Sequence, residues 1–127
     1  MIGAVIGPIT RPDSIVIGRY TDTGHFVIVG RSVPLSAAQS ISLTAVLEPA
    51  GPEHPWSDTV ISSRFGSARD RVTLTKVNPV VVAEVSADTA RQAGVYRHGV
   101  RYLRFRPELD PSDVATIQSR GADPHTA

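Results

Sequence analysis

The stretch RHGVRYLRFRPELD, residues 97–110, mixes arginines with core-forming side chains in one short segment. A regular β-strand places alternate residues on opposite faces, but Val100 and Tyr102 differ in parity from Leu103 and Phe105. One extra residue near Tyr102 or Leu103, a β-bulge, would turn all four apolar side chains toward one face. The stretch therefore predicts a bulged strand whose other face presents a row of arginines: Arg101, Arg104 and Arg106.

Two uses of this arginine row are open from the stretch alone. Guanidinium groups make bidentate contacts with phosphate, so the row suits a nucleic-acid backbone. Charged side chains on an edge strand also discourage pairing with another chain, and that use needs no ligand. The choice between them depends on where the strand lies in the fold.

The composition excludes several classes of protein. A chain of 127 residues suits one domain with its own core. There are no cysteines, which rules out disulfide frameworks, thiolate metal sites and cysteine nucleophiles. The apolar runs are too short for a membrane span, and the first residues lack the layout of a signal peptide, so we expect a cytoplasmic protein.

The charge of the chain is informative in its distribution rather than its total. The formal net charge is only +1, so bulk electrostatics does not indicate a strong polyanion binder. Acidic residues gather in the C-terminal tail, and the rest of the domain is distinctly basic. Since Lys76 is the sole lysine, this basic character comes almost entirely from arginine.

Three β-branched segments open the chain, at residues 1–9, 14–20 and 25–31, and residues 21–24 form a hairpin turn between the second and third. Pairing Tyr20 with His25 makes both faces of the hairpin apolar, so something must pack against its outside. The expected faces are Ile15, Ile17, Phe26 and Ile28 on one side and Val16, Val27 and Val29 on the other.

Both hairpin strands contain an aliphatic-Gly-Arg triplet, at residues 17–19 and 29–31. Glycine allows close approach of a neighbouring group, which favours a structural role for these glycines. Arg19 and Arg31 are candidate phosphate contacts.

A helix is expected next, because Ser36 is a suitable N-cap and Gln39 completes a capping box. It should run to about Leu47 with an apolar side made by Ile41, Leu43, Ala45, Val46 and Leu47. Residues 50–71 read as a long irregular loop that Trp56 pins to the domain. Residues 72–77 and 80–85 are two strands or one strand broken at Asn78 and Pro79, and a polar connection over residues 86–94 leads to the arginine-rich strand.

The order strand, strand, strand, helix, strand, strand matches an all-β fold with one helix, the five-stranded Greek-key barrel of the OB-fold, whose helix lies between strands 3 and 4. We expect residues 1–110 to form this domain. Residues 111–127 should form a short helical turn followed by a disordered tail.

The chain shows no catalytic constellation of its own. Its histidines are scattered without metal-ligand spacing, and phosphate-binding glycine loops and nucleophile elbows are absent.

Four phrases, taken in order, resemble the C-terminal OB domain of bacterial ATP-dependent DNA ligases, enzymes of DNA repair and recombination. They are the hairpin from IGRY at 17–20 to VGR at 29–31, HPW at 54–56, VVVAEV at 80–85 and RHGVRYLR at 97–104. The resemblance runs from Ile2 to about Val114.

The resemblance implies a domain that grips nicked duplex DNA and swings its last motif over the nucleotide. The implied DNA-binding residues are Arg19, Arg31, Arg97, Arg101 and Arg104, and the nucleotide-facing residues are Arg106 and Glu108. Leu109 stands where the motif has a lysine, which puts that lysine's phosphate contact in doubt.

The resemblance also implies a missing partner. The nucleophile of such ligases is a lysine in a Lys-any-Asp-Gly motif, whereas Lys76 is followed by Val77, Asn78 and Pro79. We therefore expect no activity and no cofactor from this chain alone. ATP and Mg²⁺ are implied for a full ligase, with a nucleotidyltransferase domain supplied in cis or in trans, and no membrane partner is expected.

Two other functions remain open. A free-standing single-strand-binding OB module would need exposed base-stacking aromatics, and most of the few aromatics here suit a core. A protein-docking OB module would need no nucleic acid at all.

Overall fold

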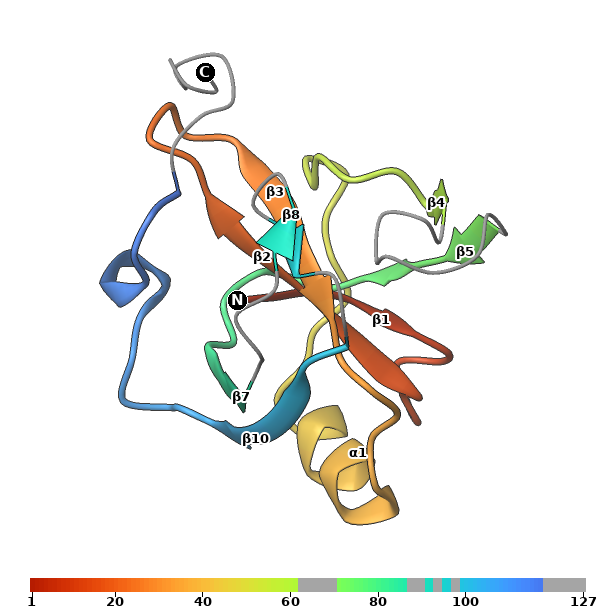
Figure 1. The fold of residues 1–127 in the computed structure, drawn as a ribbon. Helices are drawn as coiled ribbons and strands as arrows, with labels where there is room; N and C mark the ends of the chain where they lie inside the picture. Colours follow the sequence, from red (N-terminus) through yellow and green to blue (C-terminus); the bar gives the residue numbers. More distant parts are fainter. Residues whose placement is uncertain (62–70, 87–90, 93–94, 97–98, 118–127) are drawn as a thin grey trace.

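A computed structural model describes residues 1–61, 71–86, 91–92, 95–96 and 99–117, and these form a mostly β structure with one α-helix (Figure 1). The strands are β1 (Ile2–Ile6), β2 (Ser14–Tyr20), β3 (Phe26–Arg31), β4 (Thr59–Ile61), β5 (Arg71–Thr73), β6 (Thr75–Lys76), β7 (Ala83–Ser86), β8 (Arg91–Gln92), β9 (Val95–Tyr96) and β10 (Arg101–Phe105). Helix α1 spans Ala37–Thr44, and a short 3-10 turn spans Pro111–Asp113. Within these ranges neither helical segment has the length and apolarity to cross a membrane.

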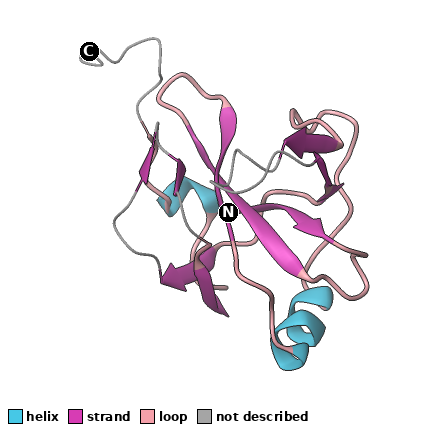
Figure 2. Ribbon diagram, turned by 45° about the vertical axis from the view of Figure 1, so that its right-hand side comes forward, coloured by secondary structure: helices cyan, strands magenta, loops and turns pink. Residues whose placement is uncertain are grey.

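The main sheet has the order β3-β2-β1-β6, with every neighbouring pair antiparallel. Strands β7 and β10 form a second antiparallel pair, and β4-β5 and β8-β9 are small hairpins. Helix α1 lies at one end of the main sheet (Figure 2). The described residues thus confirm a mostly β chain with one helix, and strand pairing among them does not close into one continuous barrel.

Main-chain contacts join the two larger sheets. A parallel bridge pairs Ser32, just after β3, with Val100, just before β10. At the start of β1, the N–H of Ile2 donates to the carbonyl of Val81, two residues before β7, at 2.9 Å. The short pair β7-β10 is therefore tied to both ends of the β1–β3 meander.

Two apolar clusters lie on opposite faces of the main sheet, because neighbouring strand residues such as Ile15 and Val16 point to opposite sides. The first cluster draws on both larger sheets and on α1: Ile2, Val5, Ile15, Ile17, Val29, Leu43, Leu47, Val77, Val81, Val100 and Tyr102. The second, on the outer face, comprises Met1, Ala4, Val16, Phe26, Ile28, Trp56, Leu74 and Val82. This second cluster confirms that the outside of the hairpin is covered.

The register of the β2-β3 hairpin differs from the one expected. Tyr20 pairs with Phe26, and His25 belongs to the turn, where its N–H donates to Thr21 Oγ1 at 3.1 Å and its carbonyl accepts from the Thr21 N–H at 2.7 Å. A register shift at Ile17 and Gly18 leaves Val29 as an extra residue. The predicted faces were therefore wrong for the four apolar residues of β3, which lie on the opposite side from the one expected: Phe26, Val27, Ile28 and Val29.

Trp56 holds its loop against the outer face of the sheet, as predicted. Its ring stacks on Phe26 with centroids 4.8 Å apart, and its indole N–H donates to the Phe26 carbonyl at 2.9 Å. A Cβ at Gly18 would lie 2.6 Å from the Trp56 ring, so this glycine has the structural role expected of it. The surrounding region is less irregular than expected, since β4 and β5 pair within residues 59–73 and β8 lies in the expected polar connection.

The capping box at the start of α1 is present as predicted. Ser36 Oγ accepts from the Gln39 N–H at 3.2 Å, and Gln39 Oε1 accepts from the Ser36 N–H at 3.0 Å. The helix ends at Thr44, earlier than expected, and Ile41 is 69% exposed rather than packed. Buried Ser40 takes an inward position instead, because its hydroxyl donates to the Pro12 carbonyl at 2.8 Å.

The bulge predicted in β10 is also present. Tyr102 pairs with Val85 and Arg104 with Glu84, which leaves Leu103 without a partner on β7. Tyr102 is buried, but Leu103 is 44% exposed, so the prediction that Leu103 faces the core was wrong. Leu103 is itself the extra residue of the bulge, and this frees its side chain from the strand's alternation.

Helix α1 and the bulge are connected by one side chain. Gln39, while closing the capping box, donates from Nε2 to the main-chain carbonyl of Tyr102 at 3.0 Å. A glutamate could complete the capping box equally well, but it has no amide hydrogens to donate.

We predict that Gln39→Glu destabilises the domain by about 1 to 2 kcal/mol, because the partly buried Tyr102 carbonyl loses its donor. Urea unfolding measures the change. Ala38→Glu is the matched control, since it places a carboxylate in the same helical turn without touching that bond and should leave stability unchanged or slightly higher. Equal stability of Gln39→Glu and the wild type would contradict the prediction.

Candidate nucleic-acid interface

The β10 bulge places Arg101 and Arg104 on the exposed side of the β7-β10 pair. Their separation of three residues would put them on opposite faces of a regular strand, and the bulge cancels that difference. Arg101 pairs with Ser86 and Arg104 with Glu84, and both arginines are exposed. Arg106 follows directly, fixed by its N–H, which donates to the Val82 carbonyl at 2.8 Å.

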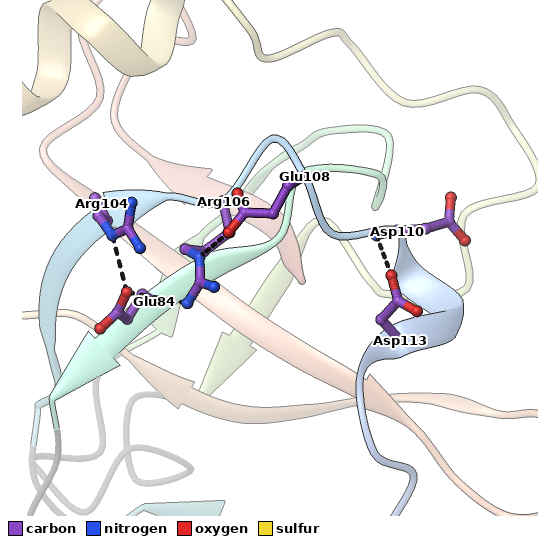
Figure 3. Close-up of polar contacts among 6 residues, drawn as sticks. All are labelled: Glu84, Arg104, Arg106, Glu108, Asp110 and Asp113. Carbon is purple, nitrogen blue, oxygen red and sulfur yellow. Dashed lines mark hydrogen bonds and ion pairs between the residues drawn. The ribbon is translucent and has the colours of Figure 1, made fainter.

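Two carboxylates, those of Glu84 and Glu108, hold the guanidinium groups of Arg104 and Arg106 (Figure 3). Arg104 Nε donates to Glu84 Oε1 at 3.0 Å, and Arg106 Nη1 donates to the same oxygen at 3.2 Å. Arg106 Nε donates to Glu108 Oε2 at 2.6 Å.

The hydrogen bond from Glu108 raises the pKa of Arg106. The pKa of Glu108 is lowered by a hydrogen bond from its own backbone N–H and then by the Arg106 guanidinium. Arg106 and Glu108 are therefore both charged at neutral pH. Three guanidinium groups, counting Arg101, and two carboxylates leave one net positive charge.

The structure places the other DNA-binding candidates apart from one another. Arg19 pairs with Val27, which packs on the first cluster, whereas Arg31 pairs with Val16 of the second cluster. Paired residues share a face, so Arg19 and Arg31 lie on opposite faces of the sheet. Arg97 lies outside the described residues.

Arg31 does lie beside the β10 arginines. Its carbonyl accepts from the Val100 N–H at 2.9 Å. Ser32 and Val100 are bridged and both buried, so the residues next to them, Arg31 and Arg101, face the opposite side. The arginines gathered on this surface are Arg31, Arg101, Arg104 and Arg106.

Leu109, at the position of the motif lysine, packs against the second apolar cluster and is half-buried. Its N–H donates to the Arg106 carbonyl at 3.1 Å. Beyond it, Asp110 caps the 3-10 turn, and its N–H donates to Asp113 Oδ2 at 2.8 Å (Figure 3).

Sequence reasoning missed Glu84 and the second role of Gln39. Glu84 is the one charged residue in the apolar phrase VVVAEV, and that contrast is the signal that could have identified it. Among the residues that the structure describes, four aromatic side chains offer little for base stacking, since Phe26, Trp56 and Tyr102 are buried and Tyr20 packs on Phe26 at 4.9 Å. This arrangement disfavours the single-strand-binding alternative.

His54 is a structural residue of the outer face. The Trp56 N–H donates to its Nδ1 at 3.2 Å, so Nε2 carries the proton and donates to the Gly3 carbonyl at 2.8 Å. Burial is the main cause that lowers the pKa of His54 below 6.5. In the ranges that the structure describes, no group of three or more histidine or acidic residues could hold a metal ion.

We predict that His54 makes stability fall with acidification. Because its pKa is lower in the folded state, the unfolded chain takes up the proton first, and stability declines as the pH drops below about 6.5. The slope contributed by one group cannot exceed about 1.4 kcal/mol per pH unit. Urea unfolding between about pH 7.5 and 5 measures it.

Two histidine variants test the assignment of this slope. His54→Gln should flatten the decline, whereas His25→Gln, at an exposed turn residue, should retain it. The prediction fails if both variants keep the wild-type slope.

Comparison with known proteins relates the chain to the DNA ligases. It is 37% identical over 111 residues to DNA ligase C1 of Mycolicibacterium smegmatis (strain ATCC 700084 / mc(2)155). The alignment covers 83% of this chain but 31% of the ligase, so the chain spans about a third of that relative's length. No protein-family model matches the chain. The chain is thus homologous to a segment of a DNA ligase, as its sequence phrases predicted.

Proposed function

We propose that this chain is the OB-fold domain of an ATP-dependent DNA ligase and that it grips nicked duplex DNA for a nucleotidyltransferase domain in cis or in trans. The observation that carries the proposal is the β10 bulge, which aligns Arg101 and Arg104 on one exposed face. Homology to DNA ligase C1 supports the ligase setting. The lysine nucleophile belongs to the partner domain, so this chain contributes binding and orientation rather than covalent chemistry.

The strand connections support the OB-fold part of the proposal. The β1–β3 meander is followed by α1. Strands β6 and β7, with Asn78 and Pro79 between them, together correspond to a broken fourth strand. Strand β10 takes the fifth position, next to the end of β3 through the Ser32–Val100 bridge. The Ser32–Val100 bridge and the bond from the Ile2 N–H to the Val81 carbonyl join the β7-β10 pair to both ends of the β1–β3 meander, which is compatible with the strand order of a five-stranded Greek-key barrel.

Arg31, Arg101 and Arg104 are the proposed contacts with DNA phosphates. Each phosphate contact releases counterions, so log K should fall with log salt at a slope of roughly 0.9 per contact. With so few contacts, the isolated domain should bind modestly and only at low salt. DNA repair and recombination are the proposed settings of this activity.

Arg106 and Glu108 are the proposed nucleotide-facing residues. The Arg106 side chain is 29% exposed, and its guanidinium is oriented by Glu84 and Glu108. It suits contact with a nucleotide phosphate bound to the partner domain. ATP and Mg²⁺ would be held by the full ligase.

We predict that Arg101→Ala and Arg104→Ala each weaken binding to nicked duplex DNA and reduce the salt slope by about 0.9. Fluorescence anisotropy at several salt concentrations measures both quantities. Arg11→Ala, at an exposed arginine between β1 and β2, is the matched control and should behave like the wild type.

Three results would contradict this proposal. One is no binding at high protein concentration and low salt, and another is binding unaffected by the β10 variants. A preference for single-stranded over nicked duplex DNA would favour the single-strand-binding module instead.

A further inference from the structure

Two arginines converge on a single oxygen atom at the surface of the β7-β10 pair. Arg104 Nε and Arg106 Nη1 both donate to Glu84 Oε1, at 3.0 and 3.2 Å (Figure 3). A phosphate oxygen carries the same sign of charge and accepts hydrogen bonds from guanidinium groups in the same way. The carboxylate therefore occupies a position that suits a phosphate oxygen.

Strand geometry puts Glu84 in this position. Its neighbours Ala83 and Val85 pack against the first apolar cluster, so Glu84 points outward. The bulge then makes Arg104 its direct cross-strand partner. Arg106 is additionally held by Glu108, so Glu84 is the contact that both arginines share.

The contact is accessible to a ligand. The side chains of Arg104, Glu84 and Arg106 are 60%, 39% and 29% exposed. Ion pairs at such exposed positions contribute little to stability. A polyanion that approaches this face can therefore displace the carboxylate at low energetic cost.

We propose that Arg104 and Arg106 form a phosphate-binding site that Glu84 occupies in the free protein, and that a backbone phosphate of nucleic acid displaces Glu84 when DNA binds, in a state distinct from the one in which Arg106 faces the nucleotide. Nucleic acid as the natural ligand rests on the proposed function, whereas the phosphate site follows from this chain's own geometry. Glu84 then acts as an internal competitor. It lowers the affinity for a single phosphate, so that stable binding of DNA requires several phosphate contacts at once.

The competitor role predicts a gain of affinity when the charge of Glu84 is removed. Glu84→Gln in the intact chain should bind nicked duplex DNA about three- to tenfold more tightly at low salt. The gain should shrink as salt rises, because screening weakens the ion pairs in the wild type. Glu48→Gln makes the same change in net charge away from this contact and should leave affinity nearly unchanged. Adding Arg104→Ala to Glu84→Gln should abolish most of the gain.

A second probe separates the phosphate site from the DNA function. Inorganic tripolyphosphate is titrated into the wild type and Glu84→Gln while the side-chain Nε–H signals of Arg104 and Arg106 are followed by NMR. We expect both signals to shift, at lower tripolyphosphate concentration in the variant. Thermal unfolding of each variant verifies that it is folded.

The results of the two titrations separate the phosphate site from the DNA function. Unchanged or weaker DNA binding by folded Glu84→Gln overturns the inference, because Glu84 would then be orienting the arginines rather than competing. No DNA binding by either protein, with tighter tripolyphosphate binding by the variant, supports the phosphate site and overturns the proposed DNA function. If neither DNA nor tripolyphosphate binds either protein, both proposals fail.

Discussion

The carbonyl of Tyr102 ties helix α1 to strand β10 at the bulge that sets the arrangement of the surface arginines. Gln39 is suited to it because its amide accepts from Ser36 and donates to Tyr102 at the same time. Without the bulge at this point, Tyr102 and Phe105 could not both face the core, and Arg101 and Arg104 could not share the outer face. One local irregularity thus satisfies the packing of the core and the arrangement of the charges together.

Features of the fold that depend on neighbouring residues could be predicted from the sequence, whereas features that depend on contacts between distant segments could not. The bulge could be predicted because the parity conflict between Tyr102 and Phe105 lies within one stretch, and the capping box could be predicted for the same reason. The exposure of Leu103 could not, since it depends on which residues of β7 pair with β10. The hairpin register likewise turned on side-chain bonds within the turn, which apolar alternation does not encode.

The candidate site divides in the same way. Arginine-rich β10 was visible in the sequence, but its partner Glu84 required the β7-β10 register, and the separation of Arg19 from Arg31 required the β2-β3 pairing. Exposed ion pairs contribute little to stability. The contacts of Glu84 therefore affect the positive charge that Arg104 and Arg106 can offer to a ligand more than they affect the stability of the fold. Arg104 and Arg106 are paired with Glu84 and Glu108 until a ligand competes for them.

The segment after β10 places a mechanical condition on the proposed nucleotide-facing role. The Arg106 N–H is bonded to Val82, the Arg106 carbonyl accepts from Leu109, and the Leu109 side chain packs on the second apolar cluster. Arg106 therefore lies between two anchors and is not part of a free arm. Under the proposed function, its guanidinium reaches a nucleotide on the partner only if the whole domain moves as a unit. A leucine at the lysine position favours this arrangement, because its side chain fixes the segment to the core while Arg106 is left to make the phosphate contact.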